Sequence, residues 1–188
     1  MGFIMTLVAS TLSVSTRGEK ILLATLEREG RPDVTSALVA RQFELTYETA
    51  HKNLAGITHE ESLIFPSPAG NSVNWVLGHI VATRNIIMRT LGTAPIWTAE
   101  EAAPYERGAK PSRDGNGARP LTEIVGALDR SQEMVVQRIR ALSVDDLHRP
   151  SPMGTVAEAL TILGFHEAYH VGQLGIQRRL IGKDGAIA

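Results

Sequence analysis

Along most of the chain, apolar residues recur every three or four positions, the period of an amphipathic helix. The first such segment runs from Asp33 to about Gly56 and has no internal glycine or proline. Its apolar positions include Leu38, Phe43, Leu45, Tyr47, Ala50 and Leu54. We therefore expect a first bundle helix here, ended by the stretch GITHEESLIFPSPAG, which glycine and proline interrupt.

A second helix is predicted from residue 71 to about residue 92, over NSVNWVLGHIVATRNIIMRTLG. Asn71 or Ser72 can cap its start, because their side-chain oxygens accept hydrogen bonds from free backbone N–H groups. One stripe of this helix carries Trp75, His79, Ala82 and Ile86. A histidine thus lies on an apolar helix face.

Two further helices are predicted after a long connection. Residues 93–119 are rich in Gly, Pro and charge without a sustained period, which is typical of a crossover or a loop that covers a site. A helix then spans residues 120–142, with Pro120 at a permitted first-turn position. The last helix begins at the capping box TVAE, residues 155–158, and ends at about Ile181, before Gly182.

These helices predict an all-α fold, because no segment has a convincing run of strand-like alternation. We expect a four-helix bundle over residues 34–188, with the long crossover between its second and third helices. Residues 1–33 are expected to form an N-terminal extension. Within it, GEKILLATLERE at 18–29 favours a short helix, and the apolar run at 1–16 favours a docked arm.

Composition narrows the classes of function. The chain has 188 residues, and 19 basic against 20 acidic ones indicate neither a nucleic-acid partner nor an anionic membrane surface. The apolar N-terminal run lacks Lys and Arg before Arg17 and is too short to span a bilayer, so we expect a cytoplasmic protein. Cysteine is absent, so a transition-metal site must use His, Asp or Glu.

The last helix contains the pattern HEAYH, with His166 and His170 four residues apart. On a helix both imidazoles project from one face, close enough to bind one ion. Leu163 and Leu174 share their stripe, so we expect the two histidines to face the core, where hydrogen-bonded core histidines are the alternative. The third inward-facing histidine, His79, makes a shared metal site the simpler interpretation. The remaining histidines, His51, His59 and His148, are expected at the surface.

HEAYH also matches the H-E-x-x-H signature of zinc metalloproteases, which need a third protein ligand from further along the chain. The residues after His170 contain no His or Glu, and only Asp184 is acidic. In the extended pattern, Gln173 stands where Gly is required and Ile176 where His is required. The protease interpretation is therefore disfavoured.

With His79 as the third ligand, the chain resembles the DinB-like (DinB/YfiT) superfamily. The resemblance rests on NWVLGHIVATRN, on HEAYHVGQLG and on the terminal QRRLIG, and it covers about residues 34–182. It implies an up-down-down-up bundle, frequent homodimers, and a divalent metal, zinc or nickel, held by His79, His166 and His170. The first thirty or so residues depart from the compact family pattern, so the resemblance implies no role for them.

A three-histidine site leaves coordination positions open for water or substrate, as in catalytic metal sites. The resemblance implies thiol-dependent S-transfer with a low-molecular-weight thiol and a small-molecule substrate, while the catalytic residues stay unknown. Two alternatives remain open. One is a metal-dependent hydrolase with Glu167 as candidate base, although this glutamate is also compatible with a supporting or solvated role. The other is a non-catalytic, stress-related metal-binding protein.

Three other residues are candidates for the surroundings of the site. Gln173 can hydrogen-bond near the metal or pack between helices. Trp97 and Tyr105 in the long connection can line a pocket over the site or anchor the connection to the bundle.

Overall fold

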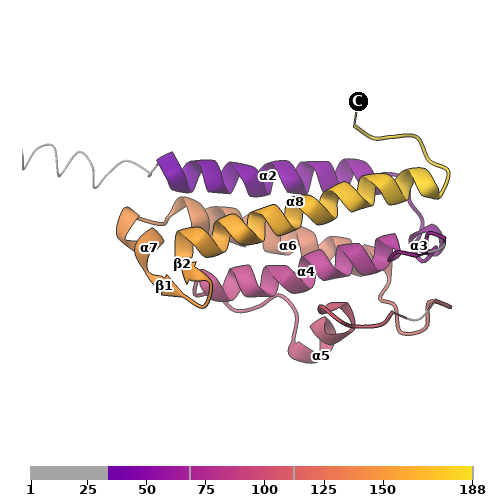
Figure 1. Cartoon of the computed structure of the whole chain (residues 1–188), viewed down its shortest axis with the longest axis horizontal. Helices are drawn as coiled ribbons and strands as arrows, with labels where there is room; N and C mark the ends of the chain where they lie inside the picture. Colours follow the sequence, from indigo (N-terminus) through magenta and orange to yellow (C-terminus); the bar gives the residue numbers. More distant parts are fainter. Residues whose placement is uncertain (1–33, 68, 112, 188) are drawn as a thin grey trace, which may run out of the picture. The chain divides into compact units, whose positions relative to one another are not determined.

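The computed structural model describes residues 34–67, 69–111 and 113–187. Four long helices dominate this part of the chain (Figure 1): α2 (Val34–Leu54), α4 (Val73–Thr90), α6 (Leu121–Arg140) and α8 (Val156–Leu180). The all-α prediction is confirmed. The predicted helix at residues 18–29 and the docked arm lie outside the described residues.

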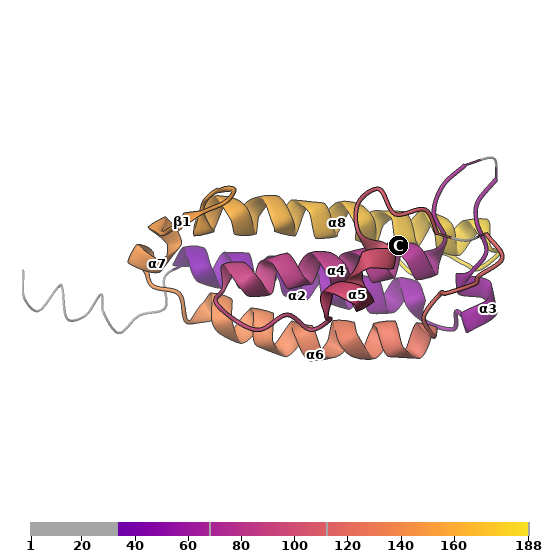
Figure 2. The same ribbon diagram turned by 90° about the horizontal axis from the view of Figure 1, so that it is seen from below.

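The long helices pack in a ring, in which α2 and α4 each contact both α6 and α8 (Figures 1 and 2). Side chains show the directions: Gln42 of α2 lies against Gly164 of α8, and Asn53 lies against Gly175 further along both helices. Helices α2 and α8 are therefore parallel. Figure 1 shows α4 and α6 running the opposite way, which gives the up-down-down-up order.

The ends of the helices agree with the predicted caps. Ser72 accepts a hydrogen bond from the backbone N–H of Trp75 at the start of α4. Thr155 and Glu158 form the expected capping box of α8, which ends before Gly182 at a φ of +85°. Pro120 precedes the first turn of α6 as its N-cap residue.

Short elements fill the connections. They are α3 (His59–Ser62), α5 (Ala99–Ala102), the 3₁₀ helix η1 (Ala103–Tyr105), α7 (Val144–His148) and the antiparallel strands β1 (Pro150–Ser151) and β2 (Gly154–Thr155). Sequence periodicity missed the two strands, because two residues are too few to show alternation. No described helix is long and apolar enough to cross a bilayer.

Two apolar residues of α2 are exposed, although the pattern of apolar positions placed them on the buried face of the helix. Leu38 is 66% exposed and Leu45 is 48% exposed, while Phe43 and Ala50 are buried. The core-facing stripe of α2 follows Ala40, Phe43, Ala50 and Leu54. Leu38 and Leu45 fall outside it, because about 100° separates successive residues around a helix.

Helix α4 is buried on nearly all sides. Its bundle face packs on α6 and α8, and the crossover with α5 and η1 packs against it as well (Figure 2). The predicted covering role of residues 93–119 thus corresponds to a real layer over α4. That layer positions one part of the histidine site.

Candidate metal centre

The structure brings together the three histidines that the sequence singled out. His79 comes from α4, and His166 and His170 come from successive turns of α8. The Nε2 atom of His166 lies 3.2 Å from the Nε2 of His79 and 3.2 Å from the Nε2 of His170. One nitrogen from each ring thus points into a common centre, with the candidate ligand atoms all within 4.8 Å of one another. Their role as metal ligands stays a prediction.

Two of the rings are oriented by hydrogen bonds at the opposite nitrogen. His79 Nδ1 lies 2.6 Å from the backbone oxygen of Tyr105, and His170 Nδ1 lies 2.8 Å from Oε1 of Gln173. Carbonyl oxygens only accept hydrogen bonds, so both Nδ1 atoms carry the proton. The Nε2 atoms of His79 and His170 therefore present lone pairs to the centre, the tautomer that metal-ligating histidines adopt.

The geometry fits a small cation. Two nitrogens held about 2.0–2.1 Å from a tetrahedral zinc ion are about 3.3 Å apart, close to the 3.2 Å separations found here. Without a cation, the Nε2 of His166 can donate to one neighbouring lone pair at most. Its buried Nδ1 has no hydrogen-bond partner among the described residues. A cation would satisfy all three converging lone pairs at once.

The surroundings of His166 and His170 favour the neutral form of both imidazoles. Burial, with smaller contributions from His170 and His79, lowers the pKa of His166 to about 4. Burial also lowers the pKa of His170, against a raising effect of its hydrogen bond to Gln173. Both imidazoles are therefore neutral at pH 7, and neutral imidazole is the form that binds metal.

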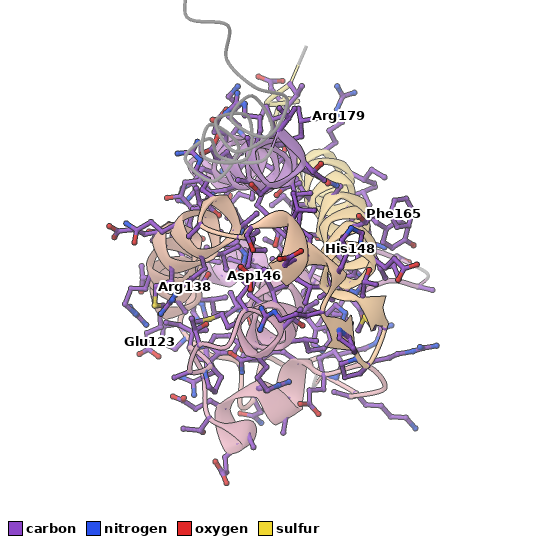
Figure 3. The ribbon with its side chains drawn as sticks, turned by 90° about the vertical axis from the view of Figure 1, so that its left-hand side faces the viewer. Glu123, Arg138, Asp146, His148, Phe165 and Arg179 are labelled. Atoms are coloured by element: carbon purple, nitrogen blue, oxygen red, sulfur yellow. The ribbon has the colours of Figure 1, made fainter. Side chains whose placement is uncertain are left out.

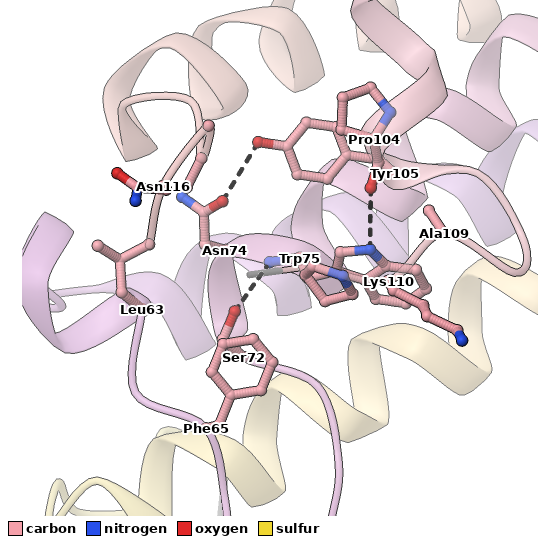
Figure 4. Close-up of a pocket in the computed structure, with 13 residues that line it drawn as sticks. Leu63, Phe65, Ser72, Asn74, Trp75, Pro104, Tyr105, Ala109, Lys110 and Asn116 are labelled. Carbon is pink, nitrogen blue, oxygen red and sulfur yellow. Dashed lines mark hydrogen bonds between the residues drawn. The ribbon is translucent and has the colours of Figure 1, made fainter. Parts of the chain in front are cut away.

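An aromatic ring supports His79 from the side. Trp75, one turn earlier on α4, stacks on His79 with ring centroids 4.9 Å apart and ring planes 8° apart. The indole Nε1 donates to the backbone oxygen of Pro104 at 3.1 Å (Figure 4). The contact fixes Trp75 to the crossover, so the crossover limits the movement of the His79 ring.

Gly78 allows the crossover to approach α4 closely. A Cβ atom at Gly78 would lie 2.1 Å from Cδ1 of Tyr105, which is far inside van der Waals contact. The Tyr105 hydroxyl donates to Asn74 Oδ1 at 3.3 Å (Figure 4). It also accepts from the backbone N–H of Arg119 at 2.9 Å. Tyr105 is thus held at both ends, and its backbone oxygen is brought to His79.

Glu167, between the two histidines of α8, is only 2% exposed and points into the core. Its oxygens accept from Arg84 Nε at 2.9 Å and Arg84 Nη2 at 2.7 Å, and from the Thr46 hydroxyl at 2.6 Å. Two expectations are corrected by this arrangement. Glu167 is not solvated, which leaves the supporting role among those considered for it as the one that agrees with its buried contacts. His166 and His170, expected to face the core, are half-buried beside it. The core stripe of α8 runs through Leu163, Glu167, Val171 and Leu174, about 100° away from the histidines.

The Arg84 guanidinium is fully buried, and every N–H it carries has a partner. Besides Glu167, it donates to the backbone oxygen of Leu128, the Ser131 hydroxyl and Oε1 of Gln132 on α6. Gln132 in turn donates to the backbone oxygen of Phe43 on α2. All four long helices are joined by this network. A buried ion pair that is satisfied in this way is expensive to break from one side.

A cavity of about 710 Å³ adjoins the histidines. His79 and His166 form part of its wall, together with Trp97 of the crossover and Met153 of the β1–β2 turn. Trp97 is buried and lines this cavity, while Tyr105 anchors the crossover, so each of these aromatics takes one of the two roles considered for them. A volume of this size is typical of a small-molecule site.

The other histidines lie apart from the centre. His148 is exposed, as expected. His51 and His59 are partly buried: His51 Nε2 lies 2.7 Å from an Asp129 oxygen, and His59 Nδ1 accepts from the backbone N–H of Leu121. Each joins two helices, so neither is a free surface residue.

Sequence reasoning missed three parts of the site. The backbone oxygen of Tyr105 leaves no mark in a residue pattern. Arg84 and Gly78 do leave one, since an arginine and a glycine inside an otherwise apolar helix call for a special environment.

Comparison with known proteins agrees with this architecture. The family model described as the DinB superfamily matches residues 42–174. A search of curated proteins found no match. Among solved structures, the chain is similar to the crystal structure of a conserved protein from Enterococcus faecalis, with a TM-score of 0.61 and 16% identity over 78% of this chain and 96% of that one. At this identity, the similarity shows the fold alone.

Proposed function

Because the chain belongs to the DinB superfamily and its three histidines converge, we propose that it is a metal-dependent enzyme. His79, His166 and His170 would hold one divalent ion, zinc or nickel, through their Nε2 atoms. The observation that carries the proposal is the set of lone pairs directed at one point by the hydrogen bonds of Tyr105 and Gln173. Three nitrogen ligands leave a position open, as in catalytic sites.

The adjoining cavity favours catalysis over a purely structural role. Two of the three histidines lie in its wall, so a small molecule in the cavity reaches the open side of the centre. When bound, the ion would lower the pKa of a water or thiol placed there. The apolar walls would limit the access of bulk water to the reacting groups.

We further propose that a small thiol is transferred to an alkylating electrophile: the sulfur bonds to the electrophilic carbon as the bond to the leaving group breaks, and the thiol proton passes to solvent. Hydrolysis benefits from a positioned general base, and the ion pair with Arg84 occupies the Glu167 carboxylate. Among the described residues that line the cavity, the one carboxylate is that of Glu106, which is exposed. A thiol needs less help, because binding to a metal cation deprotonates it outright. The sulfur would come with the co-substrate, since the chain has no cysteine.

Metal analysis tests the first part of the proposal. Protein purified without a nickel column should contain close to one equivalent of zinc or nickel, and alanine at His79, His166 or His170 should remove it. His148→Ala is the matched control, because His148 is exposed and lies outside the cluster. Equal metal content in all four variants would refute the metal site.

An activity screen tests the second part. Metal-loaded protein would be assayed with low-molecular-weight thiols plus alkylating electrophiles, and in parallel with ester and amide substrates. Thiol-dependent turnover that is lost in His170→Ala supports S-transfer. Hydrolysis without thiol would favour the hydrolase. Full metal occupancy without any turnover would favour a metal-binding protein that is not an enzyme.

A homodimer belongs to the same proposal. The outer face of α8 carries an apolar stripe made of Ile162, Phe165, Tyr169, Ile176 and Leu180, each at least half exposed. Phe165 points away from the bundle in Figure 3. A second copy is the occupant that the family resemblance leads us to expect, and light scattering at several concentrations would test it.

A further inference from the structure

The cavity beside the histidines follows one face of α4. His79, Ala82, Thr83, Ile86 and Arg89 all line it, at the spacing of a single helix stripe. Ten residues separate the histidine from the arginine, which is about 15 Å along a helix axis. A molecule in this cavity can thus contact the candidate metal centre and a guanidinium group together.

Most of the remaining wall is apolar. It includes Pro95, Trp97 and Ala102 from the crossover, and Ile162 and Leu163 from α8. The polar side chain of Asn85 is already engaged, since it donates to the backbone oxygen of Trp97 and accepts from the N–H of Ile96. The cavity therefore suits a molecule with an apolar body.

The ionisable groups of the wall, apart from the histidines, are Arg89, Glu106 and Arg107. All three are exposed, so their charges stay in contact with solvent at the edge of the cavity. Neither guanidinium group makes a hydrogen bond or ion pair with the side chain or backbone of another described residue. Arg89 and Arg107 outweigh Glu106, so the cavity edge carries a net positive charge, and neither guanidinium group has a partner in the part of the chain that the structure describes.

From this arrangement we infer that the cavity binds a small organic anion. Its apolar body would lie along Ile86, Trp97 and Leu163, with a carboxylate or similar group at Arg89 or Arg107. Guanidinium groups pair well with carboxylates because they present two parallel donors. The inference rests on the proposed function only in that the bound anion would be the substrate, and anion binding itself needs no metal.

Three probes with one skeleton test the charge preference: 4-phenylbutyrate, the neutral 4-phenylbutanamide and the cationic 4-phenylbutylamine. Their dissociation constants would be measured by NMR titration, in zinc-loaded protein and in the His79→Ala variant. The carboxylate should bind more tightly than the amide, and the amine most weakly. Because exposed charges are screened, the preference should shrink as salt is raised. Amide binding equal to carboxylate binding would overturn the inference.

Charge variants locate the effect. Arg89→Gln and Arg107→Gln should together weaken binding of the carboxylate about tenfold, since a hydrogen bond to a charged group contributes more than a neutral one. Binding of the amide should not change. Glu106→Gln should strengthen carboxylate binding, because it removes a like charge. Arg138→Gln is the control, since Arg138 lies on α6 outside the cavity (Figure 3).

The outcomes separate this inference from the proposed metal site. The arginine substitutions would be made both in zinc-loaded protein and in the His79→Ala variant. If they remove the carboxylate preference in both, the anion site is supported even if the protein does not bind zinc. A preference that needs zinc and ignores both arginines would mean that the carboxylate binds the metal, and this would overturn the inference. In that case the metal site itself would stand.

Discussion

Replacing Gly78 by alanine tests the idea that the crossover positions His79. The new Cβ would lie 2.1, 2.4 and 2.6 Å from three ring atoms of Tyr105. Carbon atoms in ordinary contact are about 3.5–4.0 Å apart, so the ring or the helix must retreat by more than about 1 Å. The ring cannot easily turn aside, because hydrogen bonds hold its hydroxyl to Asn74 and Arg119. The whole segment, including the backbone oxygen that orients His79, should move.

Two energetic effects oppose each other in this variant. Overpacking of a filled site costs about 1–3 kcal/mol, whereas alanine in place of glycine inside a helix gains at most about 1 kcal/mol. With contacts this short, we expect the upper part of the cost and a net loss of about 1–2 kcal/mol. The weakened hydrogen bond at His79 Nδ1 should also lower zinc affinity about 10- to 100-fold.

Urea unfolding of the metal-free protein and competition titration with zinc would measure the two effects separately. Gly172→Ala is the matched control on α8, since a Cβ there meets no atom within 4 Å. It should be at least as stable as the parent protein. Adding Tyr105→Ala to Gly78→Ala should cost less than the sum of the single changes, because the clash is removed. A Gly78→Ala protein with unchanged stability and unchanged zinc affinity would refute the reasoning.

Three further predictions concern the residues around the histidines. Glu167→Leu alone should lower the free energy of unfolding in urea by about 3–5 kcal/mol, because Arg84 is left as an unpaired buried charge. Adding Arg84→Met should recover part of this loss. A Glu167→Leu protein as stable as the parent would contradict the prediction. The metal-free protein should be most stable above pH 6.5 and should lose stability as the pH falls toward 4. The reason is that the pKa of His166 is lowered to about 4 in the folded protein, so the unfolded chain takes up the proton at a higher pH. Thermal melts of the His166→Gln variant should therefore show a flatter pH profile. Gln173→Ala should weaken zinc binding about tenfold by freeing the His170 ring, whereas Gln137→Ala, which alters a surface pair on α6, should leave the affinity unchanged.

Local signals explain why much of the fold could be predicted. The capping residues Ser72 and Thr155 act within one turn of their own helices, so their effect can be read from a few neighbouring letters. His79 could be singled out because histidine is unusual on an apolar stripe, and His166 and His170 because a spacing of four residues places both imidazoles on one side of a helix. Their meeting in space further required that α4 and α8 be neighbours and that α8 be rotated so that His166 and His170 face His79.

The features that could not be predicted from the sequence depend on how the helices face one another. The pattern of α8 is apolar around most of its circumference, so periodicity alone could not decide whether the histidines or Glu167 face the core. Leu38 and Leu45 were ambiguous for a different reason, because the buried face of α2 also carries the polar residues Ser36, Thr46 and Asn53. The orienting oxygen of Tyr105 comes from the backbone, which carries no sequence signal, and its position follows from the tertiary packing of the crossover.

The ion pair of Glu167 with Arg84 also sets the rotation of α8. If the helix turned by one residue, about 100°, a different side chain would face Arg84 and its charge would lose its partner in the core. The ion pair thus favours a single rotation of α8 about its own axis. In that setting the histidines on either side of the glutamate are delivered to the edge of the bundle, facing His79. Any attempt to transplant this histidine cluster into another helical bundle should therefore carry the arginine and the glutamate with it.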